Sequence, residues 1–414
     1  MSSRFSEENH LLLKQFFGFF ALLTLLSCVP PLPQEPFRKE EPPPGRLKKE
    51  FFPLTDDGDK KSLLTAIDKS LSFLERKIAG EAPSRSLPGS FGSFFTPEKT
   101  RRTLKLFRDI YFFSADLSEL ETKVNEKFAF IGRPDEDIGP PLLLTGYYEP
   151  VFDGSLTPEG EYRYPIYRLP ADLVEIRNGN SAFGNGNGRR KIGRMEKGEL
   201  VPYYSREEID TRGALLGKGY QLAWLKDPWE RFVLHIQGSG QIRTSDGKIF
   251  RVGYAGSNGR PYRGIGQYLV QLGCFPEQDL SLRRVQEFIR ENPERAEEIF
   301  NQNERYIFFR SIESKEGPYG SLGVSLTAGR SIATDHNIYP QGALAYLIAR
   351  QPVLNGGGKT IDKAPLKRFV LNQDTGAAMK GSCRVDFFWG TGEKAGMMAG
   401  ELRDEGKIYF LLAK

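Results

Sequence analysis

The chain has 414 residues, of which 39% are hydrophobic and 12% aromatic, so it can bury a core for two domains or for one domain with a large insertion. Its 44 glycines and 27 prolines are typical of a turn-rich β protein rather than a helical one. The net charge of +5 is mild, and no dense Lys/Arg block alternates with aromatic residues. This pattern argues against nucleic-acid binding but allows attraction to an anionic polymer.

Residues 1–27 have the pattern of a lipoprotein signal peptide. Arg4 and Lys14 precede an apolar stretch of about a dozen residues, which is too short for a comfortable membrane span. The stretch ends at Leu25-Leu26-Ser27-Cys28, which resembles a bacterial lipobox. We therefore expect the Cys28 thiol to be lipidated and Cys28 to become the first mature residue. An ordinary cleaved signal and an uncleaved anchor are the alternatives.

Residues 28–50 are rich in proline and charge and predict an extended tether, whose segment from Val29 to Gly45 would reach roughly 50 Å. Globular sequence follows. Apolar residues recur at helical spacing from Leu63 to Ile78, and Gly80 is a stop signal. Thr96-Pro97 opens a second helix, and a third spans roughly Ser118 to Phe128. We expect these helices to pack on a core and to carry no chemistry.

From about Pro141 the pattern changes to short β-rich runs, namely LLLTGYYEPVF, YRYPIYRL, YQLAWL and FVLHIQGSG. A Gly/Asn loop from Asn178 to Lys191 predicts a solvent-exposed insertion. Helical patterns return at 263–273, 282–291 and 293–303, and β patterns run from Ile307 to Lys414. This order predicts a mainly β chain with peripheral helices, in which one β domain is interrupted by another.

The chain has few groups for metal or nucleophilic chemistry. Besides Cys28 the chain has Cys274 and Cys383, and either a disulfide between them or two separate thiols is compatible with an oxidising compartment. The three histidines form no metal-ligand spacing, so we expect neither a metal nor a cofactor. His235 and His336 are the bases available to a nucleophilic serine, and no G-x-S-x-G elbow is present.

Two carboxylates near the C-terminus are candidates for acid–base chemistry. In GSCRVDFFWGTG, strand alternation puts Arg384, Asp386 and Phe388 on one face, which could be exposed to solvent or packed against rings. In LNQDTGAAMKG, Asp374-Thr375-Gly376 matches the loop of aspartic proteases, but such an enzyme needs two loops and the chain has no second copy. A protease is therefore a remote alternative. Asp335 fits a turn before a strand, whereas Asp210 and Asp227 have the pattern of ordinary surface or turn residues.

Two glycine bends could contact a sugar. TGYYEP and HIQGSGQI each end an apolar run with small or aromatic polar groups. Glycine would let a ligand approach the backbone, while Tyr147, Tyr148 and Gln237 could stack on sugar rings and hydrogen-bond to them. Two hairpin turns with core tyrosines are the alternative.

Several segments in order closely resemble the membrane-bound lytic murein transglycosylase A family of Gram-negative bacteria, from about residue 140 to the end. They are LLLTGYYEPVFDGS, FVLHIQGSGQI, VGYAGSNGRPYRGIGQYL, LTAGRSIATDHNIYPQGALAYL and LNQDTGAAMKGSCRVDFFWGTGEKAGMMAGEL. The resemblance implies a double-psi β-barrel catalytic domain, built from residues 51–147 and 308–414 together with the N-terminal helices. It also implies a smaller β domain inserted at 148–307, with a groove between the two for a glycan strand.

The resemblance further implies an exolytic, non-hydrolytic cleavage of the MurNAc-β-1,4-GlcNAc bond of peptidoglycan. One aspartate protonates the glycosidic oxygen and then deprotonates the C6 hydroxyl of MurNAc, which closes a 1,6-anhydro ring. The residue matching the catalytic aspartate is Asp386, while Asp374 supports it and Asp335 is the third aspartate of the motif region. Residues matching the groove lining are Thr145, Tyr147, Gln237, Gly238 and Ser239. Lys380 is expected either to stabilise the leaving oxygen or to support its loop.

An acid must hold its proton near neutral pH, and an aspartate starts near a pKa of about 3.9. We expect Phe388 and Asp374 to raise the pKa of Asp386, and Arg384 to point outward rather than lower it. The rival interpretation is a glycan binder or a hydrolase on the same barrel, as in expansin-like proteins. A hydrolase would need a second carboxylate, with Glu149 and Asp335 as candidates.

The expected partners are peptidoglycan glycan strands and cell-wall synthase complexes, with no nucleic acid. We also expect a monomeric lipoprotein, held by its lipid anchor in the outer membrane and facing the periplasm.

Overall fold

The computed structural model describes residues 47–48, 53–81, 91, 94–136, 139–176, 191–313 and 317–414. The predicted signal peptide, Cys28, most of the predicted tether and residues 178–190 of the predicted Gly/Asn loop lie outside the described residues. In the part of the chain that is described, no helix combines the length and the apolar character that crossing a membrane requires.

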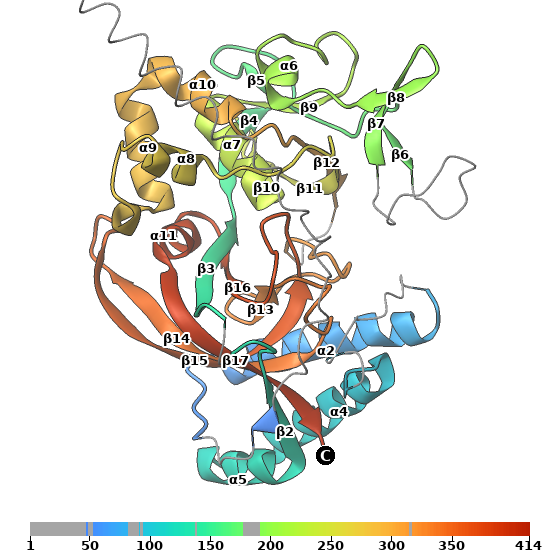
Figure 1. The fold of residues 1–414 in the computed structure, drawn as a ribbon, viewed down its shortest axis with the longest axis vertical. Helices are drawn as coiled ribbons and strands as arrows, with labels where there is room; N and C mark the ends of the chain where they lie inside the picture. The colour runs from blue at the N-terminus through green and yellow to red at the C-terminus, as the bar shows by residue number, and fades with distance from the viewer. Residues whose placement is uncertain are drawn as a thin grey trace, which may run out of the picture. The chain divides into compact units, whose positions relative to one another are not determined.

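The largest sheet contains strands from both ends of the described chain. In chain order these are β1 (Leu47–Lys48), β2 (Phe128–Gly132), β3 (Leu142–Glu149), β13 (Ser331–Ala333), β14 (Leu344–Leu354), β15 (Thr360–Asp374), β16 (Arg384–Thr391) and β17 (Arg403–Ala413). Their order is β1-β2-β17-β14-β15-β13-β16-β3, and an additional pairing of β3 with β17 closes the last six into a barrel. The β13–β15 and β16–β3 pairs are parallel and the others antiparallel (Figure 1).

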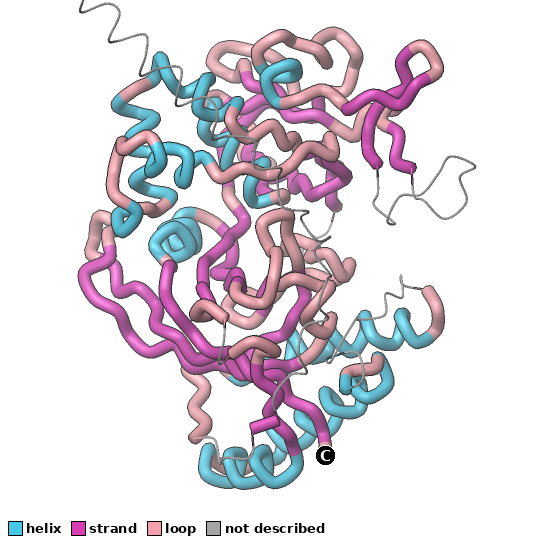
Figure 2. Tube along the Cα trace, in the orientation of Figure 1, coloured by secondary structure: helices cyan, strands magenta, loops and turns pink. Residues whose placement is uncertain are grey.

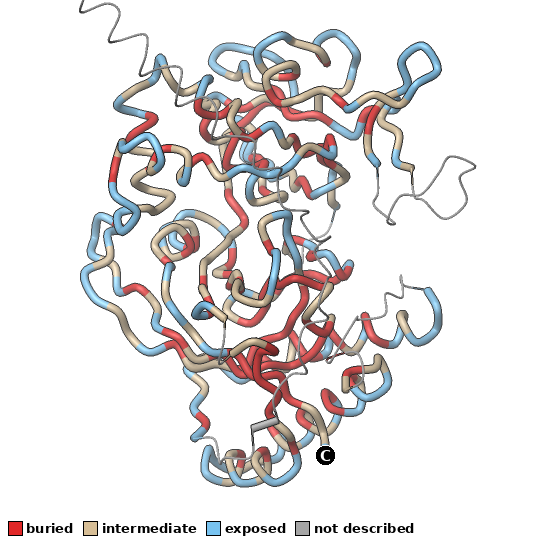
Figure 3. The backbone as a smooth tube through the Cα atoms, viewed as in Figure 1, coloured by how far each residue is buried: buried red, intermediate tan, exposed pale blue. Residues whose placement is uncertain are grey.

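Alternation along the barrel strands explains how the barrel is filled and covered. Side chains such as Val370 and Phe410 belong to a core cluster enclosed by the strands, whereas their neighbours Phe369 and Leu411 belong to a second cluster. Three helices pack on this second cluster, namely α2 (Lys60–Ile78), α4 (Pro97–Phe113) and α5 (Leu117–Lys127). Figure 3 shows the buried stretches of β14, β15 and β17 gathered together, and Figure 2 shows these helices beside them.

The predicted N-terminal helices are confirmed, and local signals explain their bounds. Asp59 caps α2 by accepting a hydrogen bond from the Ser62 amide, and Gly80 follows the helix with φ of 79°. Thr96 caps α4, whose first residue is Pro97.

A second sheet lies between β3 and β13 in the chain. It contains β4 (Val151–Ser155), β5 (Tyr164–Tyr167), β9 (Gln221–Leu225), β10 (Ser239–Arg243), β11 (Ile249–Ser257) and β12 (Ile307–Ile312), in the order β12-β11-β10-β4-β9-β5. A separate three-stranded sheet contains β6 (Val174–Ile176), β7 (Lys191–Glu196) and β8 (Glu199–Pro202). The expected fold class, mainly β with a barrel, peripheral helices and a second β region, is confirmed.

Helices accompany the second sheet. They are α6 (Arg206–Asp210), α7 (Pro228–Gln237), α8 (Ile265–Gln271), α9 (Leu282–Glu291) and α10 (Ala296–Asn301), with short 3₁₀ turns at Glu277–Asp279 and Pro293–Arg295. The helical predictions at 263–273, 282–291 and 293–303 are thus confirmed. A last helix, α11 (Glu393–Glu401), joins β16 to β17.

Two sequence predictions in this region are wrong. The run FVLHIQ is not a strand but the body of α7, because Asp227 caps the helix and Pro228 occupies its first position. Asp210 is not a surface residue. Its side chain is buried, lies 2.9 Å from Arg231 Nη1 and accepts a hydrogen bond from the Tyr306 hydroxyl at 3.0 Å. The buried Asp210 carboxyl group is tolerated there because Arg231 pairs with it.

Candidate active site

Asp386 lies in the middle of β16, beside Thr145 of the parallel strand β3. The Thr145 hydroxyl donates a hydrogen bond to Asp386 Oδ1. The neighbours of Asp386 in sequence, Val385 and Phe387, face the enclosed core of the barrel, so the carboxyl group projects on the other side. The Asp386 side chain is 17% exposed. It therefore combines a fixed position with limited contact with solvent.

Burial and charge act on Asp386 in opposite directions. Burial raises the pKa of Asp386 above its ordinary value, and this effect exceeds the lowering by the Arg384 guanidinium and the Thr145 hydroxyl. Arg384 Nε lies 3.4 Å from Asp386 Oδ1, so the expectation that Arg384 points outward is wrong. Strand alternation puts both side chains on one face, where the long arginine side chain can reach the carboxylate.

Asp374, at the end of β15, is held by backbone amides. Its Oδ1 accepts hydrogen bonds from the Ser321 and Thr375 amides, both at 2.8 Å. Burial nevertheless raises the pKa of Asp374 to about 6. Gly320 allows this approach, because a Cβ there would lie 2.6 Å from the Gln373 carbonyl oxygen.

The short strand β13 brings the two aspartates together. Ala333 is the register partner of Asp374 on one side and of Asp386 on the other. Two strand spacings separate the two backbones, about 10 Å in all. Burial raises the pKa of Tyr147 most strongly, and the charges of Asp374 and Asp386 raise it further. Tyr147 is therefore close to both carboxyl groups. Its hydroxyl is buried and lies close enough to the Asp374 carboxyl group for each to shift the pKa of the other, and its ring lies 5.1 Å from that of Phe388.

Asp335, the third aspartate, has a different setting. Its Oδ1 accepts from the Asn337 amide and side chain at 2.9 and 2.7 Å, and its Oδ2 accepts from the Gly381 amide at 3.0 Å. The carboxylate therefore ties the turn before β14 to the loop before β16. The turn predicted around Asp335 is present.

Gln237, Gly238 and Ser239 occupy the junction of α7 and β10. Gln237 Oε1 accepts a hydrogen bond from the Tyr148 amide of β3 at 3.1 Å, and Gly238 ends the helix in the left-handed region with φ of 75°. Ser239 begins β10. No hydrogen bond within the described ranges joins these three residues to Asp386 or Asp374. Lys380 is exposed on the loop between β15 and β16.

The TGYYEP glycine has a packing role that the sequence did not indicate. A Cβ at Gly146 would lie 2.6 Å from Ala399 Cα, so it is α11, and not a ligand as the sequence predicts, that approaches the backbone here. Tyr148 also packs inward. Its ring lies against Gly396 of α11, and burial raises its pKa to about 12. The alternative of a core tyrosine is correct for Tyr148.

Glu149 is also structural. Its side chain is fully buried and lies 2.6 Å from Arg251 Nε, while Gln241 and Thr391 donate to it at 2.9 and 2.8 Å. These partners come from β11, β10 and β16. Glu149 therefore joins the barrel to the second sheet at the point where the chain passes from one to the other.

Sequence reasoning missed two residues near the aspartates. Ser321 supplies an amide to Asp374, and no local sequence pattern indicates that contact. Tyr262, in the loop after β11, is 38% exposed, and desolvation of its hydroxyl group raises its pKa, while Arg384 and Asp386 are close enough to affect it as well. Its position in the quoted motif VGYAGSNGRPYRGIGQYL was the available signal.

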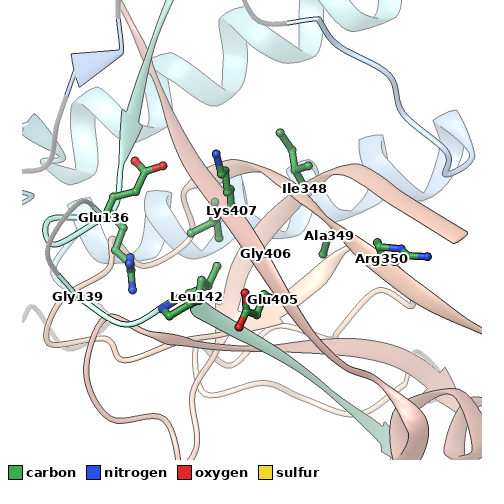
Figure 4. Close-up of a pocket in the computed structure, with 12 residues that line it drawn as sticks. Glu136, Gly139, Leu142, Ile348, Ala349, Arg350, Glu405, Gly406 and Lys407 are labelled. Carbon is green, nitrogen blue, oxygen red and sulfur yellow. The ribbon is translucent and has the colours of Figure 1, made fainter. Parts of the chain in front are cut away.

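A surface pocket of about 500 Å³ lies at the other end of β3, between β14 and β17 (Figure 4). Its lining mixes apolar side chains with charges of both signs, including Arg133, Arg350, Lys407, Glu136 and Glu405. None of the candidate site residues lines it. Over the described ranges, no three His, Cys, Asp or Glu side chains are grouped as metal ligands would be, and Cys274 and Cys383 are separate, unpaired thiols.

The protein has a closed barrel that carries two neighbouring aspartates and is joined to a second β region. It is therefore a two-part barrel protein, and known family models match both parts. The family model "MltA specific insert domain" matches residues 143–310, and the model "3D domain" matches residues 330–412. Membrane-bound lytic murein transglycosylase A of Escherichia coli K12 is 33% identical over 272 residues. The match covers 65% of this chain and 65% of that relative, so the chain spans slightly less than two thirds of the curated relative's length. The chain is therefore similar to the membrane-bound lytic murein transglycosylase A (MltA) family over both of these matched segments.

Solved structures agree with this assignment. The membrane-bound lytic murein transglycosylase of Agrobacterium tumefaciens is 28% identical, with a TM-score of 0.70 over 86% of this chain and 93% of that chain. Escherichia coli MltA with bound chitohexaose has a TM-score of 0.65 over 92% of this chain and 97% of that chain. Its identity of 24% makes it a match of fold alone.

Proposed function

We propose that this protein is a peptidoglycan lytic transglycosylase that cleaves the MurNAc-β-1,4-GlcNAc bond without water. The observation that carries the proposal is Asp386, whose carboxyl group is held on β16 beside Thr145 of the parallel strand β3 and whose burial raises its pKa. A general acid for a glycosidic oxygen needs this property near neutral pH. The names of the curated relatives, lytic murein transglycosylases, agree with the proposed substrate.

In the proposed reaction, protonated Asp386 gives its proton to the glycosidic oxygen as the bond to C1 of MurNAc breaks. The resulting carboxylate then accepts the proton of the C6 hydroxyl while O6 bonds to C1. The products are a 1,6-anhydroMurNAc end and a free GlcNAc end, and no water is consumed. Because the nucleophile belongs to the substrate, a single carboxyl group is sufficient in both steps.

The neighbouring groups have supporting roles in this proposal. Thr145 orients the Asp386 carboxyl through its hydrogen bond, and Asp374 with Tyr147 forms the polar wall beside it. Gln237, Gly238 and Ser239 would line the path of the glycan from the second sheet. Lys380 is exposed and able to approach the leaving oxygen.

The rival hydrolase needs a second carboxylate to activate water. Glu149 is fully buried and paired with Arg251, so it cannot reach a water at the site. Asp335 is buried and engaged by Asn337 and Gly381. These contacts favour the transglycosylase over the hydrolase among the candidates that the sequence offered.

Digestion of purified peptidoglycan followed by mass spectrometry of the products tests the proposal. We expect 1,6-anhydroMurNAc ends with the wild type and a loss of rate of about 10²–10⁴ with Asp386→Asn, the usual contribution of a general acid. Lys105→Gln, at an exposed position on α4, serves as the control for the folded state. Reducing MurNAc ends would show a hydrolase, and full activity of Asp386→Asn would remove the assigned acid.

We also propose that Cys28 is lipidated and anchors the protein in the outer membrane, facing the periplasm, with residues 28–50 as its tether. In this proposal the protein is a monomer that works on glycan strands alongside cell-wall synthases. The barrel would form from 51–147 and 308–414, and the inserted domain from 148–307. Replacement Cys28→Ser is expected to move the protein from the membrane fraction to the soluble periplasmic fraction. Unchanged fractionation with an unmodified N-terminal peptide would contradict lipidation.

A further inference from the structure

The hydrogen bonds of Arg384 are too long to contribute much to the stability of the fold. Its hydrogen bonds within the described part of the chain are to Asp386 Oδ1 at 3.4 Å and to Thr145 Oγ1 at 3.5 Å, both near the limit of the interaction. A guanidinium group has five N–H donors, and this one is 35% exposed. These two hydrogen bonds leave other N–H donors of Arg384 unused on a partly exposed side chain beside the proposed acid.

The fully engaged Arg330 shows the contrast. Its guanidinium makes hydrogen bonds to Ser62, Asp56, Phe369 and Asp59 at 2.8–2.9 Å, and its side chain is 1% exposed. Arg330 therefore holds together elements that are distant in sequence, whereas Arg384 bonds only to its own strand and to the adjacent β3.

The position of Arg384 is also costly for the proposed chemistry. A positive charge next to Asp386 favours the ionised carboxylate, which cannot donate a proton. The groups that face this corner are Thr145 and Tyr147 from β3, Asp374 from β15 and Tyr262 from the loop after β11. Apart from Asp386 itself, no carboxylate among the described residues forms an ion pair with the Arg384 guanidinium. A substrate anion could accept hydrogen bonds from the remaining N–H donors of the guanidinium.

The glycan of the proposed substrate supplies one kind of anion. GlcNAc is neutral, but the lactyl ether of MurNAc ends in a carboxylate, which is either free or joined to a peptide stem that carries carboxylates of its own. The planar guanidinium fork matches a carboxylate in a bidentate manner. We propose that Arg384 binds a carboxylate on the MurNAc substituent and thereby positions the sugar ring against Asp386. This inference rests on the proposed function for its substrate class.

Binding of that carboxylate has a consequence for Asp386. The bound anion offsets the charge of the guanidinium, so Asp386 becomes easier to protonate in the complex than in the free enzyme. Arg384 is then a positioning residue that couples substrate recognition to the acid. In the free protein the same residue holds Asp386 closer to its ionised form.

A binding experiment tests the recognition step without catalysis. The disaccharide GlcNAc-β-1,4-MurNAc lacks the bond that is cut, so it can be titrated into the wild type, Arg384→Gln and Arg384→Lys by NMR. The same disaccharide with its lactyl carboxylate converted to an amide is the neutral probe, and the disaccharide carrying a peptide stem is the third probe. Arg243→Gln is the matched control, because Arg243 is exposed and paired with Asp153 in the second sheet.

We expect Arg384→Gln to weaken binding of an anionic probe about tenfold or more and to leave binding of the neutral probe unchanged. Arg384→Lys should recover part of the loss. Weakening with the stem-free probe identifies the lactyl carboxylate, and weakening confined to the stem-bearing probe identifies a stem carboxylate. Equal weakening of anionic and neutral probes, or no weakening of either anionic probe, overturns the proposal.

The pH profile tests the coupling. Because protonated Asp386 is the active form, activity falls as pH rises through its pKa. In the wild type we expect this fall in kcat, which reports the complex, at higher pH than in kcat/KM, which reports the free enzyme. In Arg384→Gln the two falls should coincide, with that of kcat/KM moved to higher pH. An unmoved profile overturns the coupling. Wild-type digests without anhydro ends would instead refute the proposed function and leave the binding result standing.

Discussion

Two aspartates of the candidate site owe their raised pKa values to burial, but their partners differ. Asp386 faces a cation and a hydroxyl group, both of which favour the ionised form, and burial still exceeds them. Asp374 faces backbone amides and reaches a pKa of about 6. Desolvation is thus the stronger effect at both residues. The upward pKa shift of Asp374 is large enough to make the free energy of unfolding depend on pH.

We predict that Asp374→Asn removes a pH dependence of stability. The native state raises the pKa of Asp374 from 3.8 to about 6, so the native state binds the proton more tightly than the unfolded chain does. Its stabilising contribution is full below pH ~4 and is lost as pH rises through ~6. After allowance for partial exposure, the wild type should lose about 1–2 kcal/mol over this range relative to Asp374→Asn.

Urea unfolding at intervals between pH 4 and pH 8 measures this difference. The amide of the variant still accepts from the Ser321 and Thr375 amides, so the loop contacts are retained. Asp362→Asn, an exposed position on the same strand, is the control and should follow the wild type. A wild-type curve parallel to that of Asp374→Asn would show that Asp374 titrates normally.

At the scale of elements, the passage from β3 to β4 carries the connection between the barrel and the second sheet. β3 ends at Glu149, and β4 begins at Val151 in the other sheet. Glu149 accepts from side chains of β10, β11 and β16, and its backbone oxygen accepts from the Gly392 amide at 2.9 Å. One buried carboxylate therefore fixes strands of both sheets.

We predict that Glu149→Ala lowers the free energy of unfolding by about 3–5 kcal/mol, because it removes a fully buried carboxylate that pairs with the mostly buried Arg251. Asp153→Ala, which breaks the exposed pair with Arg243, is the control and should cost about 1 kcal/mol or less. Denaturant unfolding of both variants measures the two losses. Equal losses would mean that Glu149 does not hold the junction.

Local signals in the sequence predicted the peripheral elements better than the site. Asp59 and the Thr96-Pro97 pair set the starts of α2 and α4 through groups within a few residues. The apolar run of α7 was ambiguous, since a short apolar stretch suits a buried strand or a buried helix. Alternation assigned Arg384 and Asp386 to one face but not the direction of the arginine side chain.

On the scale of the whole molecule, the barrel depends on pairings that no local pattern reveals. β3 pairs with β16, whose residues lie more than two hundred positions later, and β17 pairs with both β2 and β3. The two aspartates lie near each other because β13 pairs with β15 on one side and with β16 on the other. The barrel was predicted from the resemblance to a family. The packing roles of Gly146 and Glu149 could be recognised only in the three-dimensional structure.

The same topology predicts which parts of the chain can fold alone. All strands of the second sheet and of the three-stranded sheet lie between residues 151 and 312, and this segment has its own buried clusters around Phe232, Leu225 and Tyr306. The barrel strands instead come from both sides of the segment, so neither side can close the barrel by itself.

We predict that residues 150–313 expressed alone show a cooperative thermal transition and dispersed NMR signals. The fragment 317–414, which keeps Ser321 and Arg330, is the control. It retains β13 to β17 but lacks β3, which leaves β16 and β17 with unpaired edges, so it should be unfolded or aggregate. Mixing it with a chain that supplies residues 53–149 should restore dispersed signals. A disordered 150–313 fragment would show that the second sheet depends on the barrel, through the Glu149 junction and the ion pair of Arg283 with Glu401 at 3.2 Å.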